Sequence, residues 1–286
     1  YEDTPDDLCA EKLFGAVFQG SALSRPILGA PETLEAMTGD FLKEYHRRHY
    51  RGDNTVVALA GSFGQEVLED IRRRFASLPG GRKQPVEPAV YTPSFVATAK
   101  PIEQNHLTLA FPGLDYNSPK RFALQLLSSI LGGGVSSRLF QQVREQQGLC
   151  YSIYSYGAGH ADTGVFCIYT ALNKETEEKA LTTIRRVVDQ LREEGPTAEE
   201  LERAREQSKA NVLMGLESTQ SRMSSLGRGA LLVGRVLDED EVIARYDAVT
   251  REDVRRLAQE LFQFQNASLS AVGRVGSADA YRALLH

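Results

Sequence analysis

The side chains of this sequence that could bind a metal or act as a nucleophile are five histidines and three cysteines. They are His46, His49, His106, His160, His286, Cys9, Cys150 and Cys167. His46 and His49 are three residues apart on a predicted helix and could in principle share a metal ion. Their helix is basic and arginine-rich, and no carboxylate partner is evident, so a solvated or helix-capping role is favoured.

The cysteines give no better candidate for chemistry. They are too few and too scattered for a disulfide framework, and they lack the spacing of a zinc site. Cys150 precedes Tyr151, but no histidine lies near it in the sequence to activate the thiol. We therefore expect inert thiols in a reducing compartment.

The composition excludes several classes of partner. The chain has 286 residues, 42% hydrophobic and 25% charged, as in an ordinary soluble globular protein, and its net charge is -5. Neither nucleic acid nor an anionic membrane is expected to bind such a surface. No apolar run approaches the ~20 residues needed to span a bilayer. The chain begins at Tyr1 and not at Met, and its first residues do not have the pattern of a signal peptide, so we expect a piece of a longer protein.

The elements that must position any site alternate irregularly between helix and strand. Hydrophobic periodicity and capping residues predict helices at 5–19, 38–49, 65–77, 118–131, 136–147, 174–194, 238–246 and 251–262. A capping box formed by Thr197 and Glu200 predicts a long helix after Thr197. Short apolar or alternating runs predict strands at 55–61, 94–100, 104–111, 150–158, 164–172 and 267–273. Hairpin-like strand pairs mixed with helices predict an α+β fold with a mostly antiparallel sheet.

A change of composition divides the chain. The stretch from Leu78 to Pro93 holds four prolines and Gly80-Gly81, which is typical of a linker. We accordingly predict a first domain at 1–80, a linker at 81–93 and a second domain at 94–286.

Two segments resemble each other across this linker. Thr38–Gly61 reads TGDFLKEYHRRHYRGDNTVVALAG, and Thr250–Gly273 reads TREDVRRLAQELFQFQNASLSAVG. Each consists of a capping residue, a helix, a turn with Asn, a strand and Gly, at an offset of 250 − 38 = 212. We interpret them as parts of a duplicated unit. If the second copy begins near Tyr91, the first copy lacks about 120 opening residues.

This duplicated plan and several strings resemble the pitrilysin-type zinc peptidases, or inverzincins, in a bacterial branch similar to the mitochondrial processing peptidase. Residues 132–151, GGGVSSRLFQQVREQQGLCY, are very similar to the second-domain signature of that family. YEDTPDDL at 1–8 and RPILGAPETL at 25–34 resemble first-domain segments. The resemblance covers nearly the whole chain.

The resemblance implies how the catalytic groups are distributed. Family members hold zinc with H-x-x-E-H and a Glu on a later helix. This sequence has no H-x-x-E-H, so we expect no zinc ligand and no bound cofactor in this chain, and zinc in a longer parent. The family's substrate-binding Arg and Tyr match Arg144 and Tyr151. Gly148 is expected to end the helix that carries Arg144. Gly132, Gly133 and Gly134 would let a backbone pass close to an extended peptide.

The function implied is that of the C-terminal portion of a zinc endopeptidase that cleaves extended peptides or presequences. The chain alone is expected to be inactive. Its partners would be the peptide substrate, the zinc-bearing half, and a second subunit in a homodimer or heterodimer. One alternative is a non-catalytic subunit of a heteromeric processing peptidase. Another is a structural role like that of core subunits of a respiratory complex. A bacterial cytoplasmic location is the expectation.

Overall fold

The computed structural model describes residues 3–81 and 87–285, which form two compact units. Unit 1 combines residues 1–26, 88–208 and 243–286, and unit 2 combines residues 27–87 and 209–242. Residues 82–86 of the predicted linker lie outside the described residues. Among the helices that the structure describes, none is long and apolar enough to cross a membrane.

Unit 1 is built on a five-stranded sheet with the order β1-β5-β2-β4-β3. The strands are β1 (Phe95–Ala99), β2 (Asn105–Pro112), β3 (Ser152–Gly159), β4 (Gly164–Leu172) and β5 (Ser268–Gly273). Only the β1–β5 pair is parallel, and the other three pairs are antiparallel. The predicted α+β class with a mostly antiparallel sheet is confirmed.

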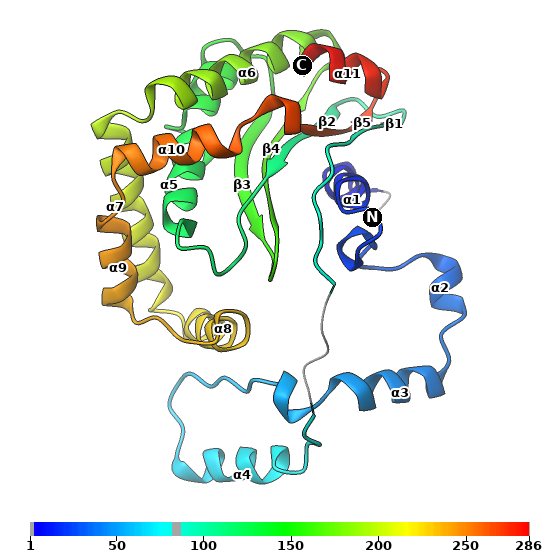
Figure 1. Cartoon of the computed structure of the whole chain (residues 1–286), viewed down its shortest axis with the longest axis vertical. Coiled ribbons are helices and arrows are strands. Elements are labelled where there is room, and N and C mark those ends of the chain that lie inside the picture. The colour runs from blue at the N-terminus through cyan, green and yellow to red at the C-terminus, as the bar shows by residue number, and fades with distance from the viewer. Residues whose placement is uncertain (1–2, 82–86, 286) are drawn as a thin grey trace. The chain divides into compact units, whose positions relative to one another are not determined.

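Helices cover one face of this sheet. They are α5 (Arg121–Gly132), α6 (Glu177–Glu194) and α10 (Arg251–Leu261), with α11 (Ala278–Leu285) packed on α6 and β1. The amphipathic helix α6 buries Ile184, Val187, Val188 and Leu191, as its 3.6-residue periodicity predicts. In Figure 1 these helices lie on one side of the strands and α1 (Pro5–Val17) lies on the other.

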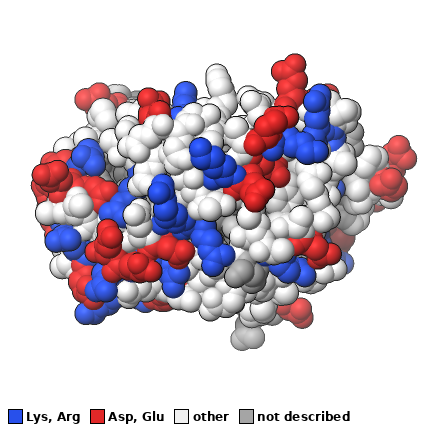
Figure 2. All heavy atoms as spheres, turned by 90° about the horizontal axis from the view of Figure 1, so that it is seen from above, with Lys and Arg blue, Asp and Glu red and all other residues white. Residues whose placement is uncertain are grey.

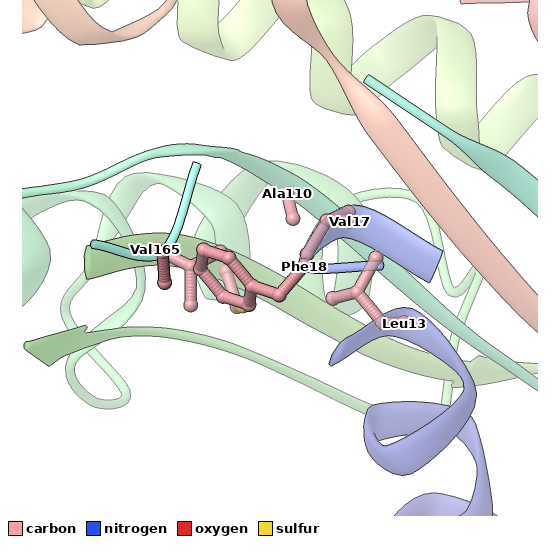
Figure 3. Packing of buried hydrophobic residues seen from close by; sticks show 7 residues of the cluster. Leu13, Val17, Phe18, Ala110 and Val165 are labelled. Carbon is pink, nitrogen blue, oxygen red and sulfur yellow. The ribbon is translucent and has the colours of Figure 1, made fainter. Parts of the chain in front are cut away.

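Helix α1 fills the second face of the sheet. Pro5 at its start and Asp6 and Asp7 in its first turn suit a helix N-terminus. Its residues Leu13 and Val17, with Phe18, pack against Ala110 of β2 and Val165 of β4 (Figure 3). Burial of these apolar side chains on a sheet is the main force that holds α1 in unit 1.

The regular secondary structure that is described in unit 2 is helical. It contains α2 (Pro31–Glu35), α3 (Gly39–His49), α4 (Gln65–Phe75) and α8 (Thr219–Arg228), and a short π-helix, Gly229–Val233, follows α8. Two helices cross between the units: α7 (Ala198–Gly215) begins in unit 1, and α9 (Glu239–Asp247) begins in unit 2.

The strand predicted at 55–61 is wrong, because the structure forms no strand there. The described part of unit 2 offers no other strand to pair with it. A single extended segment cannot satisfy its backbone groups through a ladder, so it stays irregular.

The internal repeat extends well beyond the similarity in sequence. Helix α3 and helix α10 are 212 residues apart at both ends, as are the 3₁₀ turns Gly52–Asn54 and Phe264–Asn266 (39 to 251, 49 to 261, 52 to 264). Thr38 and Thr250 both cap their helices through the side-chain oxygen. Gly61 and Gly273 share a positive φ, 131° and 140°, which favours glycine. The ends of α2 and α9, Glu35 and Asp247, keep the same offset.

The compact units do not follow the predicted linear boundaries. Residues 1–26 pack with the second copy of the repeat, and residues 209–242 pack with the first. The domains predicted at 1–80 and 94–286 remain a sequence prediction about the repeats and do not describe the compact units.

Candidate functional site

Arg144 lies in a π-helix, Phe140–Glu145, that continues the helical turn starting at Arg138. Leu139 and Val143 are fully buried and anchor this helix in unit 1. The i→i+5 bond from the Gln146 N–H to the Gln141 carbonyl, 2.9 Å, defines its wider turn. The Arg144 guanidinium lies over the Phe140 ring, 4.7 Å from its centroid, and this contact limits the positions that the side chain samples.

Tyr151 approaches Arg144 from the start of β3. Gly148, with φ 60°, ends the π-helix by donating its N–H to the Arg144 carbonyl at 2.9 Å, as predicted. The Tyr151 N–H then donates to the Ala171 carbonyl at 2.9 Å and joins the sheet. The Arg144 guanidinium carbon is 5.7 Å from the centroid of the Tyr151 ring. The structure thus brings the two predicted site residues together.

The pair is open to a ligand. Tyr151 is 70% exposed, although it is a large aromatic residue next to a buried sheet. A guanidinium flanked by two rings keeps its N–H edge available for a carbonyl or carboxylate. A phenol can donate a hydrogen bond to an oxygen that gains negative charge. The arrangement suits the binding of a peptide backbone.

The glycine run 132–134 is explained in large part by packing within the chain. A Cβ at Gly132 would meet the Ser155 nitrogen of β3 at 2.5 Å, and one at Gly133 would meet the Ser129 Cα at 2.5 Å. Ser128 and Ser155 exchange two hydrogen bonds of 3.0 Å that hold α5 against β3 at this point. A Cβ at Gly134 would meet no atom within 4 Å. Gly134 is therefore the member of the run with free space beside it.

An ion pair that the sequence analysis missed positions the turn between these glycines and Arg144. The Nε and one Nη of Arg138 each donate to an oxygen of Glu200 at 2.7 Å, and the same Nη donates to the Gly195 carbonyl at 2.9 Å. Both side chains are largely buried. The sequence predicts Glu200 as half of a capping box with Thr197, and that box is present. Glu200 also forms the ion pair with Arg138, which lies 62 positions earlier in the sequence. No local sequence pattern reveals a partner at that distance.

The ionised form of Glu200 is stabilised by this clamp. Burial by itself raises the pKa of the Glu200 carboxyl, but the hydrogen bonds from Arg138 and Thr197 outweigh it. The net result is a pKa below the ordinary value. The α6–α7 turn is thereby tied to the helix that carries Arg144.

The surroundings of the other candidate residues, the histidines and cysteines, favour structural roles. His46 stacks on Tyr50 with ring centroids 4.4 Å apart, and His49 lies over Tyr45 at 4.3 Å. Partial burial raises the pKa of the Cys150 thiol, which disfavours the thiolate that a nucleophile needs. Within the described residues, no three of the His, Cys, Asp and Glu side chains are grouped so that they could hold a metal ion.

A family model described as the peptidase M16 inactive domain matches residues 36–208, more than half of the chain. The chain belongs to the peptidase M16 family. The matched range includes Arg138, Arg144 and Tyr151, together with the glycine run.

Bacterial relatives of this M16 chain are named zinc proteases. The uncharacterized zinc protease YmxG of Bacillus subtilis is 37% identical over 263 residues, covering 92% of this chain and 64% of the relative. An uncharacterized zinc protease of Streptomyces coelicolor is 35% identical over 292 residues, covering 98% and 63%. The chain thus spans less than two thirds of the length of these two relatives.

Solved structures share the fold. A peptidase M16 inactive domain from Pseudomonas fluorescens has a TM-score of 0.86 at 25% identity, covering 96% of this chain and 67% of that one. A chain of Complex III2 from Candida albicans has a TM-score of 0.89 at 21% identity, covering 99% and 71%. The second likeness concerns the fold alone.

Proposed function

We propose that this chain is the substrate-binding C-terminal portion of a zinc endopeptidase that cleaves extended peptides or presequences. Arg144 and Tyr151 would hold the backbone of the peptide, and the zinc ion would be bound by another part of the parent. The observation that carries the proposal is the exposed Tyr151 ring against the Arg144 guanidinium. The names of the bacterial relatives support the class of reaction.

Exposed apolar residues in unit 2 support a larger parent. Leu42 and Tyr45 of α3 are 53% and 51% exposed, whereas their counterparts at the 212-residue offset, Val254 and Leu257, are 0% and 1% exposed. The second copy buries these positions because α10 packs on α5 and α6. We infer that α3 is covered in the parent by elements with the plan of residues 91–208, which belong to the zinc-bearing half.

In the proposed mechanism the chain binds the peptide and polarises its carbonyl group. It does not itself supply the attacking water. The Arg144 N–H groups would donate to a carbonyl or carboxylate of the peptide. The Tyr151 hydroxyl would donate to the oxygen that becomes negative as the peptide carbonyl is attacked. When bound in the parent, zinc would activate the water and polarise the carbonyl.

Peptide binding tests this proposal directly. A fluorescently labelled extended peptide should bind the chain with Kd about tenfold higher in the variants Arg144→Ala and Tyr151→Phe, since each loses a hydrogen bond to the peptide. Arg203→Ala on α7 and Tyr116→Phe are matched controls on exposed residues outside the pair, and they should bind like wild type. Equal affinity in all five proteins would overturn the proposed role of the pair.

Hydrolysis by the chain alone provides the second test. With zinc and a quenched fluorescent peptide, we expect no turnover that a chelator abolishes. Chelator-sensitive turnover would contradict the assignment of the zinc ligands to another part of the parent.

A second candidate function is that of a non-catalytic subunit in a heteromeric processing peptidase. The description of the matching family model as an inactive domain is compatible with it, as it is with the first function. The two functions separate in a co-purification experiment. Specific binding of a related subunit that carries H-x-x-E-H, by a full-length protein whose own motif is replaced, would favour the subunit.

A further inference from the structure

Three tyrosines gather on one face of the sheet of unit 1, close to the Arg144–Tyr151 pair. Tyr154 of β3 is paired in register with Tyr169 of β4, and Tyr156 is the next β3 residue on the same face. The centroid of the Tyr154 ring is 4.9 Å from that of Tyr169 and 6.0 Å from that of Tyr156. These three residues are called the tyrosine shelf below.

The shelf is held in place by the sheet on which it lies. Tyr169 is only 7% exposed, and its hydroxyl lies 2.7 Å from Nδ1 of His106 on β2. Tyr156 packs against the apolar cluster that joins α1 to the sheet. Tyr154 therefore lies on two rings that are already fixed in the absence of a ligand. Such a preorganised surface loses little conformational entropy when a ligand binds.

The cover over this face of the sheet ends before it reaches Tyr154. Helix α1 packs on β5, β2 and β1, and β3 is the strand at the opposite edge (Figure 1). Among the described residues, β4 is the only strand that pairs with β3. Tyr154 is accordingly 42% exposed. The shelf thus lies at an open edge of the sheet.

The surface of the shelf is aromatic and uncharged. Burial raises the pKa of the hydroxyls of Tyr154, Tyr156 and Tyr169, so all three stay protonated at neutral pH. Burial also lowers the pKa of His106, which keeps its ring neutral. By contrast, Lys and Arg are interspersed with Asp and Glu on the face of the molecule in Figure 2. Neutral rings of this kind favour another aromatic ring, in an offset-stacked or edge-to-face arrangement.

We propose that the tyrosine shelf is a subsite for an aromatic side chain of the peptide that Arg144 and Tyr151 hold. The subsite rests on the proposed function for the position of the peptide backbone. Tyr154 follows Tyr151 by three residues, which span about 10 Å of extended chain. A peptide that extends along β3 advances by the same step per residue. The aromatic residue would therefore be about three positions from the residue whose carbonyl Arg144 binds.

The absence of tryptophan from the chain provides a direct test. A series of extended peptides of equal length, each with a single Trp at a different position and Ala at the others, is titrated with the chain. The emission of the peptide Trp then reports on its own surroundings. At one position we expect a shift of the emission to shorter wavelength on binding. At that position Kd should be roughly 3–10-fold lower than for the peptide with Ala there.

Variants of Tyr154 assign the effect to the shelf. Tyr154→Ala should abolish both the emission shift and the gain in affinity at that position, and Tyr154→Phe should retain both, because the ring makes the contact. Tyr116→Ala is the matched control, since Tyr116 is 40% exposed and lies at the other end of β3, where its N–H donates to the His160 carbonyl. It should behave like wild type.

Two results would overturn the subsite: the absence of a preferred Trp position in wild type, and a preference that persists in Tyr154→Ala. The variants Arg144→Ala and Tyr151→Phe separate this proposal from the proposed function. If they weaken every peptide of the series and no position is preferred, the shelf fails alone. If they weaken none while the gain that depends on Tyr154 remains, the Arg144–Tyr151 pair fails and the shelf stands as an aromatic-binding surface. Lack of binding by every peptide would contradict both.

Discussion

Helices α3 and α10 have the same length and the same threonine cap, and each leads into a 3₁₀ turn, but they differ in burial. Helix α10 buries Val254, Leu257, Ala258 and Leu261, whereas no residue of α3 is buried. Their caps and bounds agree because short-range sequence sets them. Their burial differs because α5 and α6 cover α10, and the described part of unit 2 has no counterpart of these helices.

The segments after these helices show the same contrast. Residues 268–273 form β5 between β1 and β2, and all six are buried. The counterpart at 56–61 remains irregular, and none of its residues is buried, although it is rich in Val, Leu and Ala. A helix can therefore form here from its own residues, whereas the strand needs its neighbours. Matched substitutions in the two copies should differ in their effects for the same reason.

The largest difference is expected from removing one partner of an ion pair. Arg138→Met leaves the largely buried Glu200 carboxylate without its guanidinium, at a cost of about 3–5 kcal/mol in the free energy of unfolding. Arg47→Met breaks the Arg47–Glu44 pair of α3, which is exposed, and should leave stability unchanged within error. Urea unfolding followed by far-UV circular dichroism measures both, and equal losses would contradict the comparison.

Truncation of core positions should give the next largest difference. Leu257→Ala creates a cavity between α10 and the helices against it, and we expect a loss of about 2–5 kcal/mol. Tyr45→Ala changes the matched position of α3, where the side chain is half exposed, and should shift stability by about 0.5 kcal/mol or less. Thermal unfolding provides the measurement. In the longer parent, where α3 is proposed to be covered, the cost of Tyr45→Ala should rise towards that of Leu257→Ala.

The lowered pKa of the Glu200 carboxyl makes the stability of the fold depend on pH. A carboxyl whose folded pKa is depressed stabilises the fold above its unfolded pKa, about 4.3, and loses that contribution as the pH falls through the folded pKa. The stability difference between wild type and Glu200→Gln should therefore be full near pH 6 and shrink as the pH falls below about 4. Urea unfolding at several pH values tests this, and a difference that is constant with pH would argue against an ionised Glu200 in the clamp.

Much of this arrangement could be predicted from local sequence. The predicted caps Thr38 and the Thr197–Glu200 box are present, and the five strands of unit 1 lie within the predicted runs or close to them. The remaining features of the fold depend on interactions between residues that are far apart in the sequence. The helix predicted from Ser118 begins at Arg121, and α8, which follows the long helix α7 predicted after Thr197, was not predicted. A π-helix at 140–145 has no signature in apolar periodicity.

The candidate site shows the same limit. Arg144 and Tyr151 were predicted from a resemblance, and their contact follows from the Gly148 turn and the pairing of Tyr151 with Ala171. The Arg138–Glu200 clamp joins residues far apart in sequence and was missed. The crossing of 1–26 and 209–242 was missed too, because apolar periodicity shows that a helix has a face to bury but not which sheet it will cover.

The smallest effect is expected at the helix caps. It distinguishes the opening of a single helix from the cooperative unfolding of the packed core. Thr250→Ala removes the side-chain oxygen that accepts a hydrogen bond from the Asp253 N–H, and with it one half of a capping box. We expect a cost of about 1 kcal/mol in the free energy of global unfolding. Thr38→Ala removes the matched bond to the Phe41 N–H. Because α3 buries no residue, this loss should open α3 alone and leave the unfolding midpoint unchanged. Hydrogen exchange resolved by peptide should show faster exchange in α3 only. A lowered midpoint in Thr38→Ala would mean that α3 already unfolds together with a packed core, and the contrast between the two copies would fail.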